Sequence, residues 1–149
     1  MKQKIFLSPY SSISSDIKIY SKQEGLNFYK KGHDAFVHNK YEVAIDYFTR
    51  AVSSKIPSAS IGDAYYWIGY CHIQMNDKYL ALEYLKKVAE YPIAEKFGDA
   101  LFLSAVTYQN LDNIENANIF YKRLIDRFPG TKLARLASLK IKSLKLVED

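Results

Sequence analysis

Apolar residues recur along most of the chain at three- and four-residue steps, with polar residues between them. From Gly62 to Pro92 this pattern predicts two amphipathic helices joined at Asn76 and Asp77. Similar patterns lie on both sides of this stretch, so we predict helix pairs over about residues 22–56, 59–91 and 94–128, and a last helix over about 132–147. Three prolines are expected to close the second helices of the pairs, since proline cannot continue a helix: Pro57, Pro92 and Pro129. The fold is predicted to be all-α.

The first 20 residues do not follow the helical pattern. Pro9 and the serine cluster around it are typical of an extended or disordered segment. Ser21 and Glu24 have the spacing of a capping box, which satisfies free N–H groups at the start of a helix. We therefore predict an N-terminal arm over residues 1–20 and a repeat domain over residues 21–149.

Small residues recur at fixed intervals in the three predicted pairs. Gly25, Gly62 and Gly98 open the pairs, at separations of 37 and 36 residues. Another small residue follows seven positions later in each pair, and an alanine twelve positions after that: Gly32, Gly69 and Ala105, then Ala44, Ala81 and Ala117. A larger side chain at these later sites would hold the two helices of a pair apart. Repetition at this interval predicts a solenoid, in which each pair buries its apolar face on its neighbours.

The last predicted helix has one apolar and one basic face. Leu133, Leu136, Ala137, Ile141 and Leu144 share one side, and the other side carries Lys132, Arg135, Lys140, Lys142 and Lys145. A terminal cap on an open stack of repeats requires this division.

The order of residue types in each pair resembles the tetratricopeptide repeat (TPR). Its best copy comprises Phe28, Gly32, Tyr41, Ala44, Phe48 and Ala51. The resemblance covers residues 22–147 and implies a right-handed α-solenoid of three TPR-like helix pairs plus a C-terminal capping helix. The long period, the YYWIG element at 65–69 and the segment RFPGTKLARLASLK at 127–140 look most like the C-terminal TPR domain of the bacterial Tol–Pal-associated protein. Outer-membrane-assembly lipoproteins are similar.

Composition adds few constraints. The net charge of +5 is compatible with nucleic acid or acidic lipid, but the lysines are spread among 16 acidic residues and favour solvated helix faces. Cys71 is the single cysteine, so no intramolecular disulfide is possible. No apolar run approaches the roughly 20 residues of a membrane span, and the N-terminal apolar run is too short for a signal peptide. The chain as it stands is expected to be cytoplasmic, or periplasmic if an export signal was removed.

Residue patterns typical of enzymes do not occur. There is no phosphate-binding glycine loop, histidine metal motif or nucleophile elbow. Cys71 and His72 diverge by about 100° on a helix, and His33 and His38 are badly spaced for one helix face. We predict a protein that is not an enzyme and uses no cofactor or metal.

What the resemblance implies instead is binding of a partner protein's peptide or helix in a concave groove lined by the first helices. Carried over position by position, the groove residues would be Tyr29, His33, Phe36, Asp63, Tyr66, Tyr70, Ile73, Asp99, Phe102, Val106 and Gln109. Their aromatic members would form one continuous stripe, and the two acids would favour a basic residue of the partner. The competing interpretation is that these rings pack between first helices of adjacent pairs, and for Trp67 we expect packing.

The sequence leaves two candidate functions, which belong to different classes. The first is an interaction module whose aromatic groove takes an apolar segment of another protein. The alternative is a structural scaffold in a bacterial envelope complex of the Tol–Pal or outer-membrane-assembly type. Nucleic-acid binding is disfavoured, because aromatic residues are not interleaved with the C-terminal lysines. Self-association, and occupation of the groove by residues 1–20, stay open.

Overall fold

The computed structural model describes residues 18–148, with side chains described up to residue 145. In this range the chain forms seven α-helices and one short 3₁₀ helix. They are α1 (Lys22–Val37), α2 (Tyr41–Val52), α3 (Ser58–Gln74), α4 (Lys78–Lys87), η1 (Val88–Glu90), α5 (Phe97–Gln109), α6 (Ile114–Arg127) and α7 (Lys132–Glu148). The predicted arm lies outside the described residues except for positions 18–20. There, Tyr20 forms an isolated backbone bridge with Ser54 and packs edge-on against Phe28.

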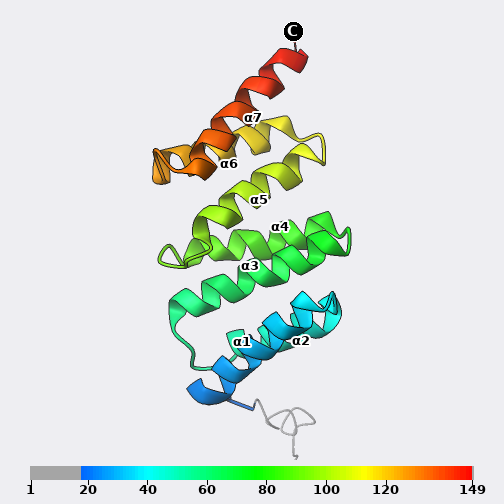
Figure 1. Cartoon of the computed structure of the whole chain (residues 1–149), viewed down its shortest axis with the longest axis vertical. Helices are drawn as coiled ribbons and strands as arrows, with labels where there is room; N and C mark the ends of the chain where they lie inside the picture. The colour runs from blue at the N-terminus through cyan, green and yellow to red at the C-terminus, as the bar shows by residue number, and fades with distance from the viewer. Residues whose placement is uncertain (1–17, 149) are drawn as a thin grey trace, which may run out of the picture.

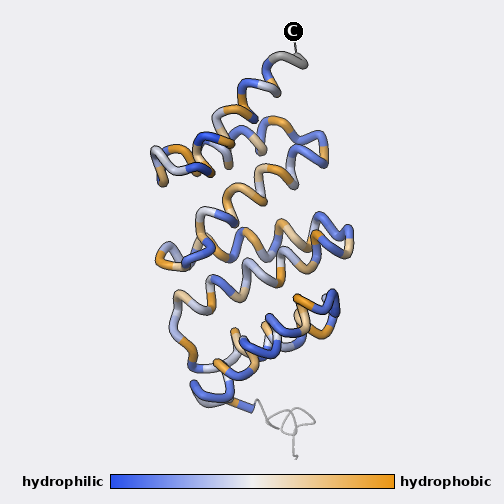
Figure 2. Tube along the Cα trace, in the orientation of Figure 1, coloured by the Kyte–Doolittle hydropathy of each residue, from blue (hydrophilic) through white to orange (hydrophobic). Residues whose placement is uncertain are grey.

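The helices form three antiparallel pairs stacked along the long axis of the molecule (Figure 1). Each helix packs mainly on its neighbours in sequence, and α7 packs on α6 and α5 at the C-terminal end of the stack. Polar and apolar positions alternate along the helices, while α5, in the middle of the C-terminal half, is mostly apolar (Figure 2). The predicted all-α solenoid of three pairs and a terminal helix is confirmed.

The same type of turn connects the two helices of each pair. Asn39, Asn76 and Asp112 have φ values of 57°, 60° and 56°, and they occupy equivalent positions, 37 and 36 residues apart. Short polar side chains tolerate this left-handed conformation better than other non-glycine residues. The residue after each one donates a backbone hydrogen bond to the last turn of the first helix, at Ala35, His72 and Tyr108. The second helix of each pair therefore starts in the same direction.

Close helix approach depends on the predicted small residues. A Cβ atom added at Gly32 would lie 2.8 Å from the Phe48 ring, and one at Gly69 would lie 2.8 Å from Leu85. The equivalent Ala105 is fully buried. The alanines of the second helices, Ala44, Ala81 and Ala117, are also fully buried. The prediction that these positions lie at helix crossings is confirmed.

Two details differ from the sequence prediction. Pro57 does not close α2, which ends at Val52, but is the residue before α3. A proline costs no hydrogen bond there, because the first N–H groups of a helix have no intrahelical acceptor. The apolar side of α7 is close to the predicted one, since Ala137 and Leu144 are buried and Leu133 and Ile141 pack against the same core cluster. Leu136 differs from the prediction, because it is 39% exposed, whereas Ala134 is buried.

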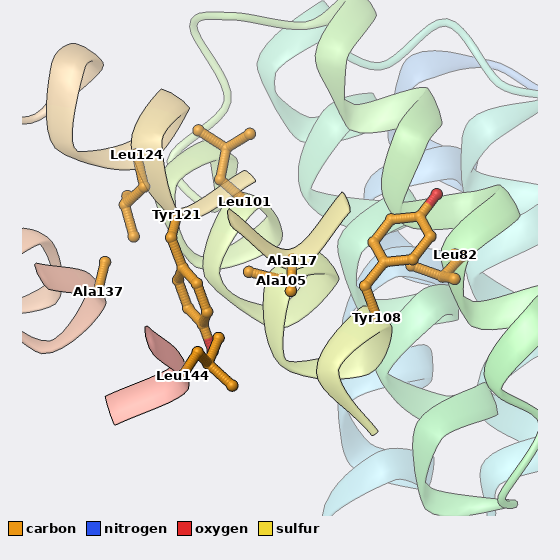
Figure 3. Close-up of a cluster of buried hydrophobic side chains, with 9 residues drawn as sticks. All are labelled: Leu82, Leu101, Ala105, Tyr108, Ala117, Tyr121, Leu124, Ala137 and Leu144. Carbon is orange, nitrogen blue, oxygen red and sulfur yellow. The ribbon is translucent and has the colours of Figure 1, made fainter. Parts of the chain in front are cut away.

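A core cluster connects the third pair to α7 (Figure 3). Tyr121 is fully buried and points toward Leu144 of α7, and its hydroxyl donates a hydrogen bond of 3.0 Å to Gln109 Oε1. Burial raises the pKa of Tyr121 to about 12. Leu124 and Ala137 complete the contact between α6 and α7. The last helix thus covers the open end of the third pair.

Removing residues 132–149 should lower the unfolding temperature and promote self-association. The truncation would expose Tyr121 and Leu124, which are fully buried in the whole chain, and contiguous exposed apolar surface favours association. Thermal unfolding followed by circular dichroism, together with light scattering after gel filtration, measures both effects. A truncated protein that remains monomeric and as stable as the whole chain would show that α7 covers nothing.

Candidate functional site

Aromatic side chains from the first helices of pairs one and two lie together. Three ring pairs cross between α1 and α3, and three more lie along α3. The centroids are 4.6 Å apart for His33 and Trp67, 5.1 Å for Phe36 and Trp67, 5.4 Å for Phe36 and Tyr70, and 6.0 Å for the stacked Tyr66 and Tyr70. Tyr29 adds an edge contact of 4.9 Å to His33. We call this set the α1–α3 aromatic cluster: Tyr29, His33, Phe36, Tyr66, Trp67 and Tyr70.

Helical spacing places these residues on one side of each helix. Tyr29, His33 and Phe36 are separated by four and three residues, and Tyr66 and Tyr70 by four, so each set lies along one face. All six side chains are half-buried. Tyr29 and His33 also pack on Phe48 in the core of the first pair, at 5.6 and 5.3 Å. The rings therefore have a packing role between first helices and still expose part of their surface.

Trp67 lies at the centre of this cluster. Its ring contacts four of the other five members, and the Lys96 Nζ lies 5.7 Å from its centroid. The expectation that Trp67 packs is confirmed. Sequence reasoning nevertheless left it out of the groove residues. Its position beside Tyr66 and three residues before Tyr70 could have indicated that Trp67 belongs to the same surface.

The two predicted acids have different surroundings. The Asp63 Oδ1 accepts a hydrogen bond of 2.8 Å from the backbone N–H of Lys96, which ties the start of α3 to the start of α5. Desolvation raises the pKa of Asp63 even though that hydrogen bond opposes it. Burial raises the pKa of Tyr66, and the charge of the nearby Asp99 raises it further. Within residues 18–148 the Asp99 carboxylate has no ion pair or side-chain hydrogen bond. Asp99 is therefore the acid available to a ligand.

The cluster is uncharged near neutral pH. Desolvation, followed by the charge of Asp63, raises the pKa of Tyr29 to about 12. Desolvation, followed by the charge of Lys96, lowers the pKa of His33. Both shifts favour the neutral ring. At neutral pH the surface can therefore offer apolar contact and hydroxyl groups.

The third pair does not extend the aromatic stripe. Phe102 packs on Tyr121 at 5.8 Å, and no ring contact among the described residues joins it to Tyr66 or Tyr70. Val106 packs on the same core cluster, and Gln109 accepts the Tyr121 hydrogen bond. The ring contacts of the α1–α3 aromatic cluster therefore do not continue to Phe102, which packs with Val106 on the core shared with α7. Ile73 is half-buried on α3, outside the ring contacts.

The reactive side chains are dispersed. Cys71 is fully buried, and desolvation raises its pKa to about 12, so it is a poor nucleophile. His72 stacks on Tyr84 at 5.4 Å, and the His38 Nδ1 lies 2.6 Å from the Asp34 carbonyl oxygen. The described part of the chain has no group of three His, Cys, Asp or Glu side chains able to hold a metal ion. Among residues 18–148, no helix combines the length and apolar character that crossing a membrane requires.

Two family models match the chain, both described as tetratricopeptide repeat. They cover residues 62–92 and 99–131, which correspond to the second and third helix pairs. No curated protein has significant sequence similarity to the chain. These matches support the repeat family and do not support the finer likeness to the Tol–Pal-associated subgroup.

Several solved structures share the fold at low sequence identity. The first TPR of Spaghetti (RPAP3), bound to an HSP90 peptide, has a TM-score of 0.70 and 17% identity, with 89% of this chain and 98% of that chain covered. The Yersinia enterocolitica type III secretion chaperone SycD, in complex with a peptide of the translocator YopD, has a TM-score of 0.71 and 16% identity, with 83% and 94% covered. The N-terminal domain of stress-induced protein-1 from C. elegans has a TM-score of 0.70 and 14% identity, with 83% and 96% covered.

Proposed function

Because the chain belongs to the tetratricopeptide-repeat family through residues 62–92 and 99–131, we propose that it is a non-enzymatic interaction module. Its ligand is a peptide or helical segment of another protein, and the α1–α3 aromatic cluster is the surface that binds it. TPR domains generally mediate contacts between proteins. Two of the similar structures hold a peptide of a partner protein.

One observation carries the assignment to this surface. Six half-buried rings bridge two first helices and keep part of their area exposed. Tyrosine and tryptophan rings provide a large, rigid contact area at a low entropic cost. Aromatic side chains of this kind are enriched among residues that dominate binding energy.

The surroundings define the chemistry of the ligand. Neutral rings favour apolar side chains of the partner, inserted beside Phe36 and Tyr70. A basic residue of the partner would lie against Asp99, because the carboxylate of Asp63 already accepts a hydrogen bond from Lys96. The proposed ligand is therefore an apolar segment with one neighbouring lysine or arginine.

Affinity capture tests this function. Immobilised wild-type chain, a Tyr66→Ala/Tyr70→Ala variant and a Tyr79→Ala variant would each be exposed to lysate, and bound proteins identified by mass spectrometry. Tyr79 is 75% exposed on α4, so its removal controls for the loss of a surface tyrosine. A partner should be retained by wild type and by Tyr79→Ala and lost from the double variant. Equal capture by all three would exclude the cluster as the binding surface.

The alternative is a scaffold role in a bacterial envelope complex of the Tol–Pal or outer-membrane-assembly type. It is supported by the sequence of residues 65–69 and 127–140 alone. In that case binding would use the outer faces or α7, and capture would survive the double substitution. A cytoplasmic or a periplasmic location is compatible with either proposal.

A further inference from the structure

A groove lies between the second helices of pairs two and three, with α5 as its floor. It consists of a cavity of about 400 Å³ and an adjoining cavity of about 530 Å³. Val88 and Ala89 form one wall, Ile119 and Phe120 the other, and Leu101 and Ser104 the floor. We call it the α4–α6 groove. No member of the α1–α3 aromatic cluster lines it, so it is a separate surface.

The equivalent groove one repeat earlier is much smaller. Between α2 and α4 the cavity measures about 190 Å³. Three of its lining residues have smaller counterparts 37 or 36 residues later. Val52 corresponds to Ala89, Tyr65 to Leu101 and Ile68 to Ser104. The volume of the α4–α6 groove thus results from three particular side chains and is not a general property of the repeat.

Ser104 is an unusual choice for the floor. Its side chain is 1% exposed, and its Oγ has no hydrogen-bond partner within residues 18–148. A buried hydroxyl without a partner is costly, whereas isoleucine at the equivalent position of α3 fills space and carries no polar atom. Packing stability therefore favours a larger apolar residue, and serine keeps the groove deep.

Two cations line opposite walls of the groove. The Lys86 Nζ on α4 lies 5.6 Å from the Tyr108 ring centroid, and the Arg123 guanidinium on α6 lies 5.4 Å from that of Phe120. Neither forms an ion pair with any residue in the described part of the chain. The adjoining cavity adds Asp126 and Arg127, so the residues that line the whole groove carry a net positive charge. Unpaired cations beside an apolar floor match an occupant that is apolar in the middle and acidic at its edges.

We propose that the α4–α6 groove is a second docking site, which takes an acidic amphipathic helix of a partner protein. The groove runs along α6 from Asn116 to Arg127, about 17 Å at 1.5 Å per residue, or roughly three helical turns. Helical walls offer no free backbone groups to pair with an extended chain, whereas a helix satisfies its own. Apolar residues at i, i+3, i+4 and i+7 would face the floor, and acidic residues on the two flanks would reach Lys86 and Arg123.

A displayed library of random 16-residue peptides tests the proposal on the full chain. Selection against wild type would be followed by counter-selection against a variant whose groove is filled by the residues of the previous repeat, Ser104→Ile with Ala89→Val. The recovered peptides should combine the helical apolar spacing with an excess of aspartate and glutamate. Peptides that bind the filled variant equally well, or that carry no excess of acids, would overturn the proposal.

Fluorescence anisotropy of the best recovered peptide gives the decisive affinities. Lys86→Glu with Arg123→Glu should weaken binding at least tenfold and reverse its salt dependence, because the acidic peptide would then be repelled and salt screens that repulsion. Lys87→Glu is the control, because Lys87 lies on the same helix but lines the smaller cavity between α2 and α4. The Lys87→Glu variant should bind the peptide with the affinity of wild type. If the two charge variants lost peptide affinity equally, the α4–α6 groove would not be the binding site.

Two further binding measurements test other ligands and sites. The first asks whether the peptide binds the α1–α3 aromatic cluster instead, and the second asks whether the groove takes a small amphiphile instead of a helix. The Tyr66→Ala/Tyr70→Ala variant should bind the peptide like wild type, since the two surfaces share no residue. A peptide that this variant no longer binds would belong to the aromatic cluster. Dodecanoate should compete only weakly, because one carboxylate and one alkyl chain cover less of the groove than a helix of roughly three turns. Full displacement by dodecanoate would assign the groove to a small anionic amphiphile and exclude the helix.

Discussion

Gly69→Leu should lower the free energy of unfolding by about 1–3 kcal/mol, through overpacking at the crossing of α3 and α4. A Cβ at this position would already lie 2.8 Å from the Leu85 Cγ and 3.2 Å from the Ala81 carbonyl oxygen. The carbonyl belongs to the backbone of α4 and cannot rotate away, so the helices must separate. Separation would also disturb Ile68 and Leu85, which are buried on either side of the crossing. Urea denaturation followed by circular dichroism measures the change.

Gly98→Ala is the matched control for this effect. Gly98 is also a helical glycine, but a Cβ there meets its nearest atom, on the Phe128 ring, at an ordinary 3.4 Å. Alanine is a better helix former than glycine by up to about 1 kcal/mol, so this variant should be as stable as wild type or more stable. If Gly69→Leu left the denaturation midpoint unchanged, the close crossing of α3 and α4 would be wrong.

The Tyr66→Ala/Tyr70→Ala variant should bind the captured partner segment at least about 2 kcal/mol more weakly than wild type, or roughly 30-fold. Tyr66 and Tyr70 stack on each other, and Tyr70 reaches Phe36 across the gap between α3 and α1. Removing both rings eliminates the α3 half of the apolar surface beside Trp67. Calorimetric titration with a peptide of the partner measures the difference.

Salt distinguishes this site from the α4–α6 groove. The aromatic cluster is neutral, so high salt should change its affinity only modestly, through the single contact at Asp99. Helicity and the unfolding midpoint of the double variant must be measured alongside. If the double variant unfolds, the two tyrosines are core residues and the assignment of the site is wrong. If it folds and binds like wild type, the partner uses another surface.

The fold was largely predictable because its determinants are local and repeated. Small residues at Gly32, Gly69 and Ala105 mark helix crossings, and each lies a fixed distance from a buried alanine of the second helix. The capping box at Ser21 also forms as predicted, with the Glu24 N–H donating to the Ser21 Oγ at 3.2 Å. The apolar side of α7 was also largely predictable. Its predicted members Leu133, Ala137, Ile141 and Leu144 pack on the core, whereas Leu136 is 39% exposed.

The site was less predictable, because its surroundings come from distant parts of the chain. Asp63 looked like a free acid, but its hydrogen-bond donor, Lys96, is 33 residues away. Phe102 has the same repeat position as Tyr66, yet a core that includes α7 decides its contacts. Helix periodicity cannot reveal either effect. The α4–α6 groove depends on a comparison of lining residues between repeats, which becomes informative only once the walls are known.

Site-specific photo-crosslinking tests the central claim, that a partner segment binds on the α1–α3 aromatic cluster. A benzophenone amino acid would replace Tyr70 in one variant and the 75% exposed Tyr79 of α4 in another. Irradiation should join the partner to position 70 and not to position 79, and the crosslinked peptide should be apolar with a neighbouring basic residue. A partner joined to position 79 and absent from position 70 would contradict the claim.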